Sequence, residues 1–147
     1  MDVLHISIEG ATYAVPLARV LEILPRVWLT PLPEAPPHVA GIFAYHGEVA
    51  LAVDVRRRLG HGPAAPLVSD HFVLTRGRTR PLAVIVDRVH GVHALSAEAL
   101  RAPPFGAPSI AGVVALPDGL LLVDDLDALL SVEDENAAER GIQALAG

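Results

Sequence analysis

Short segments in which apolar and polar residues alternate run along most of this chain, and such alternation is typical of half-buried strands. The first segment, Val3–Glu9, places Leu4, Ile6 and Ile8 at every second position. Gly and Pro residues separate the segments, as they do in loop-rich β proteins. The further predicted strands are Thr12–Pro16, Val39–Ala44, Val49–Val53, Phe72–Thr75, Leu82–Val86, Ile110–Leu116 and Leu120–Val123.

The pattern of residues 38–60 recurs in residues 109–131 at a constant offset of 71, so that Gly41 corresponds to Gly112 and Asp54 to Asp125. A weaker echo relates residues 10–23 to residues 77–92. A period near half the chain length indicates two copies of one folding unit.

The two copies predict an all-β fold with a few short helices, in which two five-stranded barrels pack side by side. Closing each sheet into a barrel covers its edges and its apolar face. We expect short helices at 55–59, 97–100 and 126–130, with Asp54, Ser96 and Asp125 as their caps.

The expected organisation is a single domain over residues 1–147. Its approximate subdomains are a first barrel at 15–70 and a second barrel at 71–131, which strand 3–9 helps to close. Pro31–Pro37 and Gly60–Pro66 are predicted surface linkers. Residues 132–147 form a tail, acidic at first, that we expect to be a frayed helix.

Composition narrows the class of protein. The chain has 52% hydrophobic residues, no cysteine and a net charge of −6 without a basic stripe. These values argue against disorder, disulfides and nucleic-acid binding. We see no signal peptide and no apolar run long enough to insert in a membrane, so we expect a cytoplasmic protein.

Metal and phosphate sites are disfavoured by the same reading. His90 and His93 are the one close histidine pair, and on a strand residues three apart point to opposite faces unless a bulge intervenes. The cluster of Asp124, Asp125 and Asp127 reads better as a strand end and a helix cap than as a metal-dependent hydrolase. The run 56–58 of three arginines is expected to be a solvated helix face.

Catalytic motifs are missing from the sequence: it has no nucleophile elbow, no phosphate-binding loop and no zinc-protease motif. We therefore expect no enzyme activity, no cofactor and no metal. Some aromatic and apolar residues beside loops are candidate interface anchors, or equally plugs for a barrel end. They are Trp28, Leu29, Phe43, Tyr45 and Phe105.

The order of several short motifs resembles the CheW family of bacterial chemotaxis coupling proteins. Val20-Leu21-Glu22-Ile23 is similar to the family's V-x-E-I box, and residues 30–36 read TPLPEAP. Residues 39–47, VAGIFAYHG, are similar to the family's glycine-bounded turn, and 51–55, LAVDV, to its strand end. The resemblance spans residues 3–131.

This resemblance implies two SH3-like barrels in an adaptor without catalysis or cofactor. It also implies binding to the regulatory domain of a CheA-type histidine kinase, to the cytoplasmic tip of a chemoreceptor, and to other CheW-like domains. Carried over by position, the partner-binding residues are Val20, Glu22, Ile23, Gly41, Tyr45, His46 and Gly47. The family's N-L-R-G turn is here Ala44-Tyr45-His46-Gly47, so a histidine stands in place of the usual arginine.

The leading hypothesis is thus a divergent scaffold that couples a kinase to a receptor. An alternative is a regulatory module that binds a small molecule in the cleft between the barrels, with histidines as a pH-sensitive wall.

Overall fold

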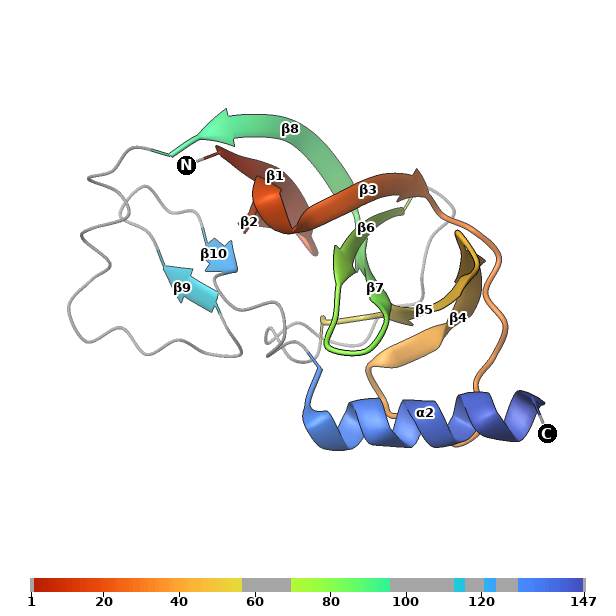
Figure 1. Ribbon diagram of the computed structural model, residues 1–147. Helices are drawn as coiled ribbons and strands as arrows, with labels where there is room; N and C mark the ends of the chain where they lie inside the picture. The colour runs from red at the N-terminus through yellow and green to blue at the C-terminus, as the bar shows by residue number, and fades with distance from the viewer. Residues whose placement is uncertain (1, 57–69, 96–112, 116–120, 124–129, 147) are drawn as a thin grey trace.

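A computed structural model describes residues 2–56, 70–95, 113–115, 121–123 and 130–146 of this protein. Strands make up most of the described chain, together with the 3-10 turn η1 (Leu17–Arg19) and the helix α2 (Val132–Ala146) (Figure 1). The strands are β1 (Asp2–Ile8), β2 (Ala11–Pro16), β3 (Val20–Pro25), β4 (Val39–Tyr45), β5 (Glu48–Val53), β6 (His71–Arg76), β7 (Pro81–Val86), β8 (Arg88–Ala94), β9 (Val113–Ala115) and β10 (Leu121–Val123).

These strands form two five-stranded sheets, which confirms the predicted all-β architecture. Sheet A has the order β8-β1-β2-β10-β9, and sheet B has the order β3-β6-β7-β5-β4. Each contains one parallel pair, β2 with β10 and β5 with β7, and its other pairs are antiparallel. A bridge between Thr30 and Ile42 brings the chain after β3 back against β4.

The two copies of the repeat exchange three strands each. At the offset of 71, β9 falls on residues 42–44 of β4 and β10 on residues 50–52 of β5. In each copy the first two strands lie in one sheet, and the following three cross into the other. The sheets therefore do not divide at residue 70, as the predicted barrels did, because β6 and β7 pair with β3 and β5.

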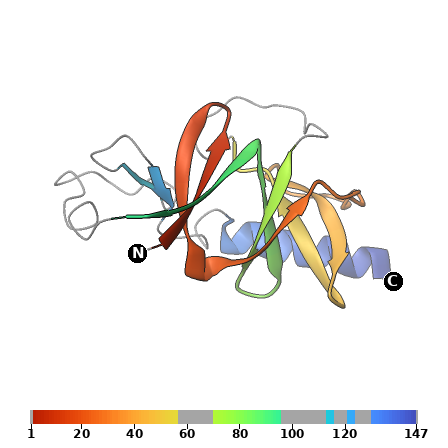
Figure 2. The ribbon, with the colours of Figure 1, turned by 90° about the horizontal axis from the view of Figure 1, so that it is seen from above.

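The crossing strands β3 and β8 were not predicted as strands. Each contains or faces a register shift, between Val20 and Glu22 in β3 and opposite His5 and Ile6 in β8. An extra residue at such a bulge interrupts the alternation of buried and exposed positions by which strands are recognised. Both strands are consequently exposed along most of their length. In Figure 2, seen from above, β8 (green) and β3 (orange) run across the middle of the view.

One apolar core joins the two sheets. It contains Leu4 and Ile6 of β1 together with Val84 and Val86 of β7. A second cluster lies within sheet B, around Phe72 and Ile85. Because alternate residues of β7 face the two clusters, all six of its residues are buried.

The C-terminal segment is not a frayed tail, because α2 is anchored to sheet B. Ser131 caps the helix, since its Oγ accepts a hydrogen bond from the amide of Asp134 at 3.1 Å. Arg78 and Arg80 pair with carboxylates of the helix, the first with Glu135 at 2.8 Å. Figure 1 shows the helix running beneath β4 and β5.

Small residues let α2 approach the segment 31–37, which was predicted to be a surface linker. A Cβ on Gly141 would lie 2.8 Å from the Pro33 carbonyl oxygen and 2.9 Å from Leu32 Cγ. Leu32 is correspondingly buried in the core with Ala138. Most residues of the segment are exposed, as a surface linker would be, while Leu32 and Pro36 are buried and anchor it to the fold. Gly60–Pro66 lies outside the described residues.

Arg56 is also buried, contrary to the expected solvated face. Its guanidinium lies 3.4 Å from Glu9 and Asp70 and 3.6 Å from Asp54 and Asp87, with only 3% of its side chain exposed. Glu9 belongs to the turn between β1 and β2, so Arg56 ties sheet A to sheet B. The Asp54 carboxylate accepts a hydrogen bond from the Arg56 amide, in a turn in which Val55 and Arg56 are not helical. The rest of that predicted helix and both others fall outside the described residues.

Candidate functional site

The partner-binding residues carried over from the motifs come from two separate segments, β3 and the hairpin β4–β5. Val20, Glu22 and Ile23 lie on β3, at the edge of sheet B. The hairpin turn follows β4, at the opposite edge in the pairing order. The structure nevertheless brings the two segments into contact, because sheet B curves until β3 and the turn meet.

The turn has tight two-residue geometry. Tyr45 pairs with Glu48, and the residues between them, His46 and Gly47, have φ angles of 47° and 79°. Two positive φ angles in succession are those of a type I′ turn, which fits the twist of a hairpin. Gly47 adopts such an angle without strain, and histidine is among the side chains that tolerate it. The turn therefore holds the His46 side chain out from the sheet.

Glu22 is the point at which the segments meet. Tyr45 donates its hydroxyl hydrogen to Glu22 Oε2 at 2.7 Å, and His46 Nε2 lies 3.5 Å from the same oxygen. The Tyr45 and His46 rings contact each other edge to face, with centroids 4.4 Å apart. The hydrogen bond to Glu22, followed by desolvation, raises the pKa of Tyr45 above its ordinary value. The phenol therefore stays protonated and keeps donating to the carboxylate.

A second ion pair braces the other side of the turn. Arg76 at the end of β6 donates to both carboxylate oxygens of Glu48, at 3.0 and 3.2 Å. This hydrogen-bonded pairing lowers the pKa of Glu48 and raises that of Arg76. Two parallel hydrogen bonds fix direction as well as charge. Sequence reasoning missed both residues, because nothing in their local pattern marks them.

Apolar side chains flank the Glu22 carboxylate. The register shift in β3 leaves three consecutive residues exposed, with Leu21 at 47% and Ile23 at 40%. We call the set Leu21, Glu22, Ile23, Tyr45 and His46 the Glu22 surface. Leu21 and Ile23 give this surface exposed apolar area of the kind that a protein partner can cover. Leu21 was missed as a site residue because its exposure depends on the bulge.

Two predicted residues support this surface from behind. Gly41 is buried, and a Cβ there would lie 2.9 Å from both Leu29 Cβ and the Thr30 carbonyl oxygen. Its lack of a side chain lets the Thr30 segment bridge to β4. Val20 is partly buried against the core. Gly41 and Val20 therefore contribute to the packing behind the Glu22 surface rather than to its exposed area.

The other candidate anchors divide between the two expected roles. Trp28 is 93% exposed, as an interface anchor would be. Phe43 is buried and contacts Phe72, with ring centroids 5.6 Å apart, and Leu29 packs against the same cluster. These two residues therefore fill the apolar interior of sheet B, the second of the two expected roles. Phe105 and the aspartates at 124, 125 and 127 lie outside the described residues.

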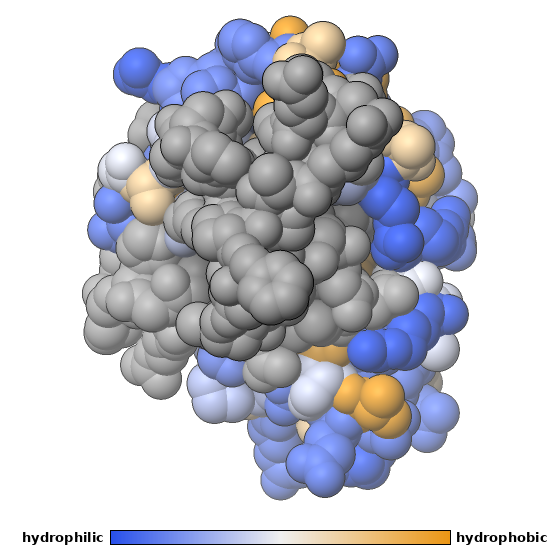
Figure 3. Space-filling model, turned by 90° about the vertical axis from the view of Figure 1, so that its left-hand side faces the viewer, coloured by the Kyte–Doolittle hydropathy of each residue, from blue (hydrophilic) through white to orange (hydrophobic). Residues whose placement is uncertain are grey.

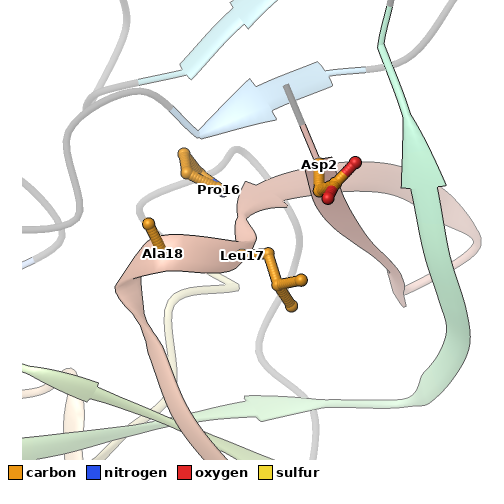
Figure 4. Close-up of a pocket in the computed structure, with 4 residues that line it drawn as sticks. All are labelled: Asp2, Pro16, Leu17 and Ala18. Carbon is orange, nitrogen blue, oxygen red and sulfur yellow. The ribbon is translucent and has the colours of Figure 1, made fainter.

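A pocket of about 470 Å³ lies between the start of β1 and η1 (Figure 4). The described residues that line it are Asp2, Pro16, Leu17 and Ala18. One exposed carboxylate among apolar groups does not make the convergent polar set that fixes a small ligand. The described surface seen in Figure 3 is mainly hydrophilic, with isolated apolar residues. Within the part of the chain that the structure describes, this pocket does not favour a small-molecule site.

Within the described residues, no group of three or more His, Asp or Glu side chains is placed to hold a metal ion. Among the described helices, none is long and apolar enough to cross a membrane.

The described fold agrees with comparisons to known proteins. The model of the CheW-like domain family matches residues 2–134. This chain belongs to that family. A chemotaxis protein CheW of Treponema pallidum is 31% identical over 83% of this chain and 77% of its own length. The chemotaxis protein CheW of Rhizobium meliloti is 28% identical over 93% of this chain and 92% of its own length.

A solved structure supports the same fold. The scaffolding protein TtCheW from Thermoanaerobacter tengcongensis has a TM-score of 0.74 at 22% identity, covering 90% of this chain and 94% of that one. The CheW-like fold thus confirms the predicted pair of SH3-like units. Membership of this family makes the chain an adaptor of chemotactic signal transduction.

Proposed function

We propose that this CheW-like protein couples a CheA-type histidine kinase to chemoreceptors, and that the Glu22 surface is one of its docking sites. It acts in the cytoplasm as a scaffold without catalysis or a cofactor. Its partners are the kinase's regulatory domain, the cytoplasmic tip of a receptor, and other CheW-like domains.

The observation that carries the docking site is the hydrogen bond of 2.7 Å from Tyr45 to Glu22. It joins two motifs that are 23 residues apart in sequence, and it does so at the solvent-facing surface. Such a bond holds an exposed carboxylate in one orientation, ready to meet a donor on a partner. Leu21 and Ile23 supply the apolar contact area beside it.

A binding measurement with one matched variant pair tests this site. Glu22→Gln removes the charge from the proposed surface, while Glu133→Gln removes a charge from the exposed first turn of α2. The kinase's regulatory domain and a receptor-tip peptide are titrated separately into each protein by calorimetry. We expect Glu22→Gln to weaken at least one of the two complexes by about fivefold or more, and Glu133→Gln to weaken neither.

Two negative results have different meanings. If the unaltered protein binds neither partner, the coupling function is wrong. If it binds and Glu22→Gln binds equally well, the function stands and the docking site lies elsewhere.

A further inference from the structure

His5 meets two histidines from the distant strand β8, His90 and His93, on one face of sheet A. The His5 ring on β1 lies 4.6 Å from the His90 ring and 5.1 Å from the His93 ring, both on β8. His90 and His93 would point to opposite faces of a regular strand. The register shift of β8 opposite His5 and Ile6 removes that constraint, and Gly91 beside it has a φ angle of 122°.

The described surroundings of the cluster offer few hydrogen-bond acceptors to the N–H groups that protonation would add. His90 Nε2 is hydrogen-bonded to Ser7 Oγ. His5 Nε2 is buried and finds no hydrogen-bond partner among the described residues. A protonated imidazole is a donor at both nitrogens, so a charged His5 would leave a buried N–H unsatisfied.

Among the described residues, the strands paired with β1 bring no compensating acid to this face. β2 pairs Thr12 with Ser7 and Ala14 with His5, and neither is charged. β8 adds a cation, because Arg88 stands opposite Ser7.

The charged groups at the ends of these elements are engaged elsewhere or carry the same sign. Arg19 on η1 is also a cation. Asp87, between β7 and β8, accepts a hydrogen bond from the Glu9 amide and lies 3.6 Å from Arg56. Glu9 lies 3.4 Å from the same guanidinium. Asp2 occupies the alternate position to Val3 and His5, and so belongs to the other face of β1.

We infer that the pairing of β1 with β8 is a proton-sensitive contact, in which protonation of the His5, His90 and His93 cluster loosens β8 from sheet A. Neutral rings pack against one another and hold the bulged strand in place. Charged rings at these separations repel, and β8 has only β1 beside it in the order of the sheet. The edge strand is therefore the part of the sheet that yields.

The direction of the pH dependence follows from His5. Burial, and then the charges that His90 and His93 acquire, lower the pKa of His5 below its ordinary value of 6.5. The folded protein thus binds protons at this site less readily than the unfolded chain. The contribution to stability is complete above pH 6.5, and it is lost as the pH falls from there through the lower folded pKa.

Amide hydrogen exchange across this pH range tests the inference. Protection factors, corrected for the intrinsic exchange rate at each pH, are compared at pH 7.5 and pH 5.5 for β8 and for β5 of sheet B. We expect protection in β8 to fall several-fold more than protection in β5, since each unit of pKa difference changes an opening equilibrium about tenfold. His5→Gln should remove most of this selective loss, whereas His46→Gln, outside the cluster, should leave it intact.

A second measurement covers the case in which His5→Gln folds poorly. His93→Gln changes an exposed ring, and the NMR titration of His5 in that variant should move to higher pH because one repelling neighbour is gone. Equal loss of protection in β8 and β5, a selective loss that persists in His5→Gln, or a His5 titration unchanged in His93→Gln would each overturn the inference.

Discussion

The strands β3 and β8 occupy equivalent places in the two sheets but carry different side chains. Each is the third strand of its repeat, crosses to the other sheet, and pairs there with a first strand, β6 or β1. Each pairing contains a register shift that exposes side chains. β3 exposes Leu21 and Ile23 around Glu22, whereas β8 presents His90 and His93 to His5.

The two copies share the strand crossing and differ in the side chains that β3 and β8 expose. The crossing is common to both copies and places strands of both copies in each sheet. The exposed residues of the bulge are not fixed by packing, so the two copies can diverge there. We propose a protein partner for the β3 edge and a response to protons for the β8 edge.

The largest expected effect comes from breaking the tie between the sheets at Arg56. Arg56→Ala leaves four carboxylates without their shared cation, and Asp70 among them is almost fully buried. Removing one partner of a buried ion pair costs about 3–5 kcal/mol, and the partial exposure of Glu9 and Asp87 points to the lower end. Urea denaturation measures this loss.

Arg140→Ala, at an exposed position of α2, is the control and should cost less than about 0.5 kcal/mol. A loss below about 1 kcal/mol for Arg56→Ala would mean that the apolar core alone joins the sheets.

Gly41→Ala should have the next largest effect, because the added methyl group meets Leu29 Cβ and the Thr30 carbonyl oxygen at 2.9 Å. Overpacking of this kind costs about 1–3 kcal/mol. Shifting the Thr30 segment should also disturb the hairpin behind the Glu22 surface. Thermal unfolding measures the cost, with Ala40→Ser on the exposed side of β4 as the control. Equal melting temperatures for the two variants would show that the segment moves aside freely.

Tyr45→Phe tests the orientation of Glu22 with a smaller expected effect. The variant keeps the ring contact with His46 and removes only the hydroxyl that donates to the carboxylate. Because this hydrogen bond is exposed, its loss should weaken binding of the partner that Glu22→Gln weakens by less than Glu22→Gln itself does. Calorimetry measures both losses of affinity. Unchanged affinity would show that the partner orients Glu22 by itself.

The pattern of the sequence predicted the regular part of the fold and missed its crossings. Leu82–Val86 was predicted because all its residues are apolar, and Val3–Glu9 because its apolar and polar residues alternate. β3 and β8 were not predicted because a bulge interrupts their alternation of apolar and polar residues. The exchange of strands between copies was not predicted because no local sequence pattern indicates it. Helix α2 was underestimated because its anchors, Arg78 and the segment around Leu32, lie far from it in sequence.

The candidate site was predicted more fully than the crossings, through the family motifs. They identified Glu22, Tyr45 and His46, which the structure brings together. They could not identify Leu21, Glu48 or Arg76, since the exposure of the first depends on a bulge and the pairing of the other two on which strands are neighbours.

The smallest expected effect is that of His46→Arg, which restores the residue usual in the family at this turn. A guanidinium carries a permanent charge and five donors, so it should pair with Glu22 more steadily than the imidazole that now lies 3.5 Å from it. The pair is exposed, with 73% of the His46 side chain accessible, so the added free energy of pairing between residue 46 and Glu22 is at most about 1 kcal/mol. The positive φ of 47° favours histidine slightly and offsets part of it.

If the turn still serves a CheA-type kinase or a receptor in the usual way, His46→Arg should tighten binding by up to about fivefold. His46→Gln, which keeps a polar side chain but not a cation, is the matched control and should not tighten it. Weaker binding in His46→Arg would show that this edge of sheet B has been re-specified for a different partner. The divergence between the repeats would then extend from their bulges to the turn at residues 45–48.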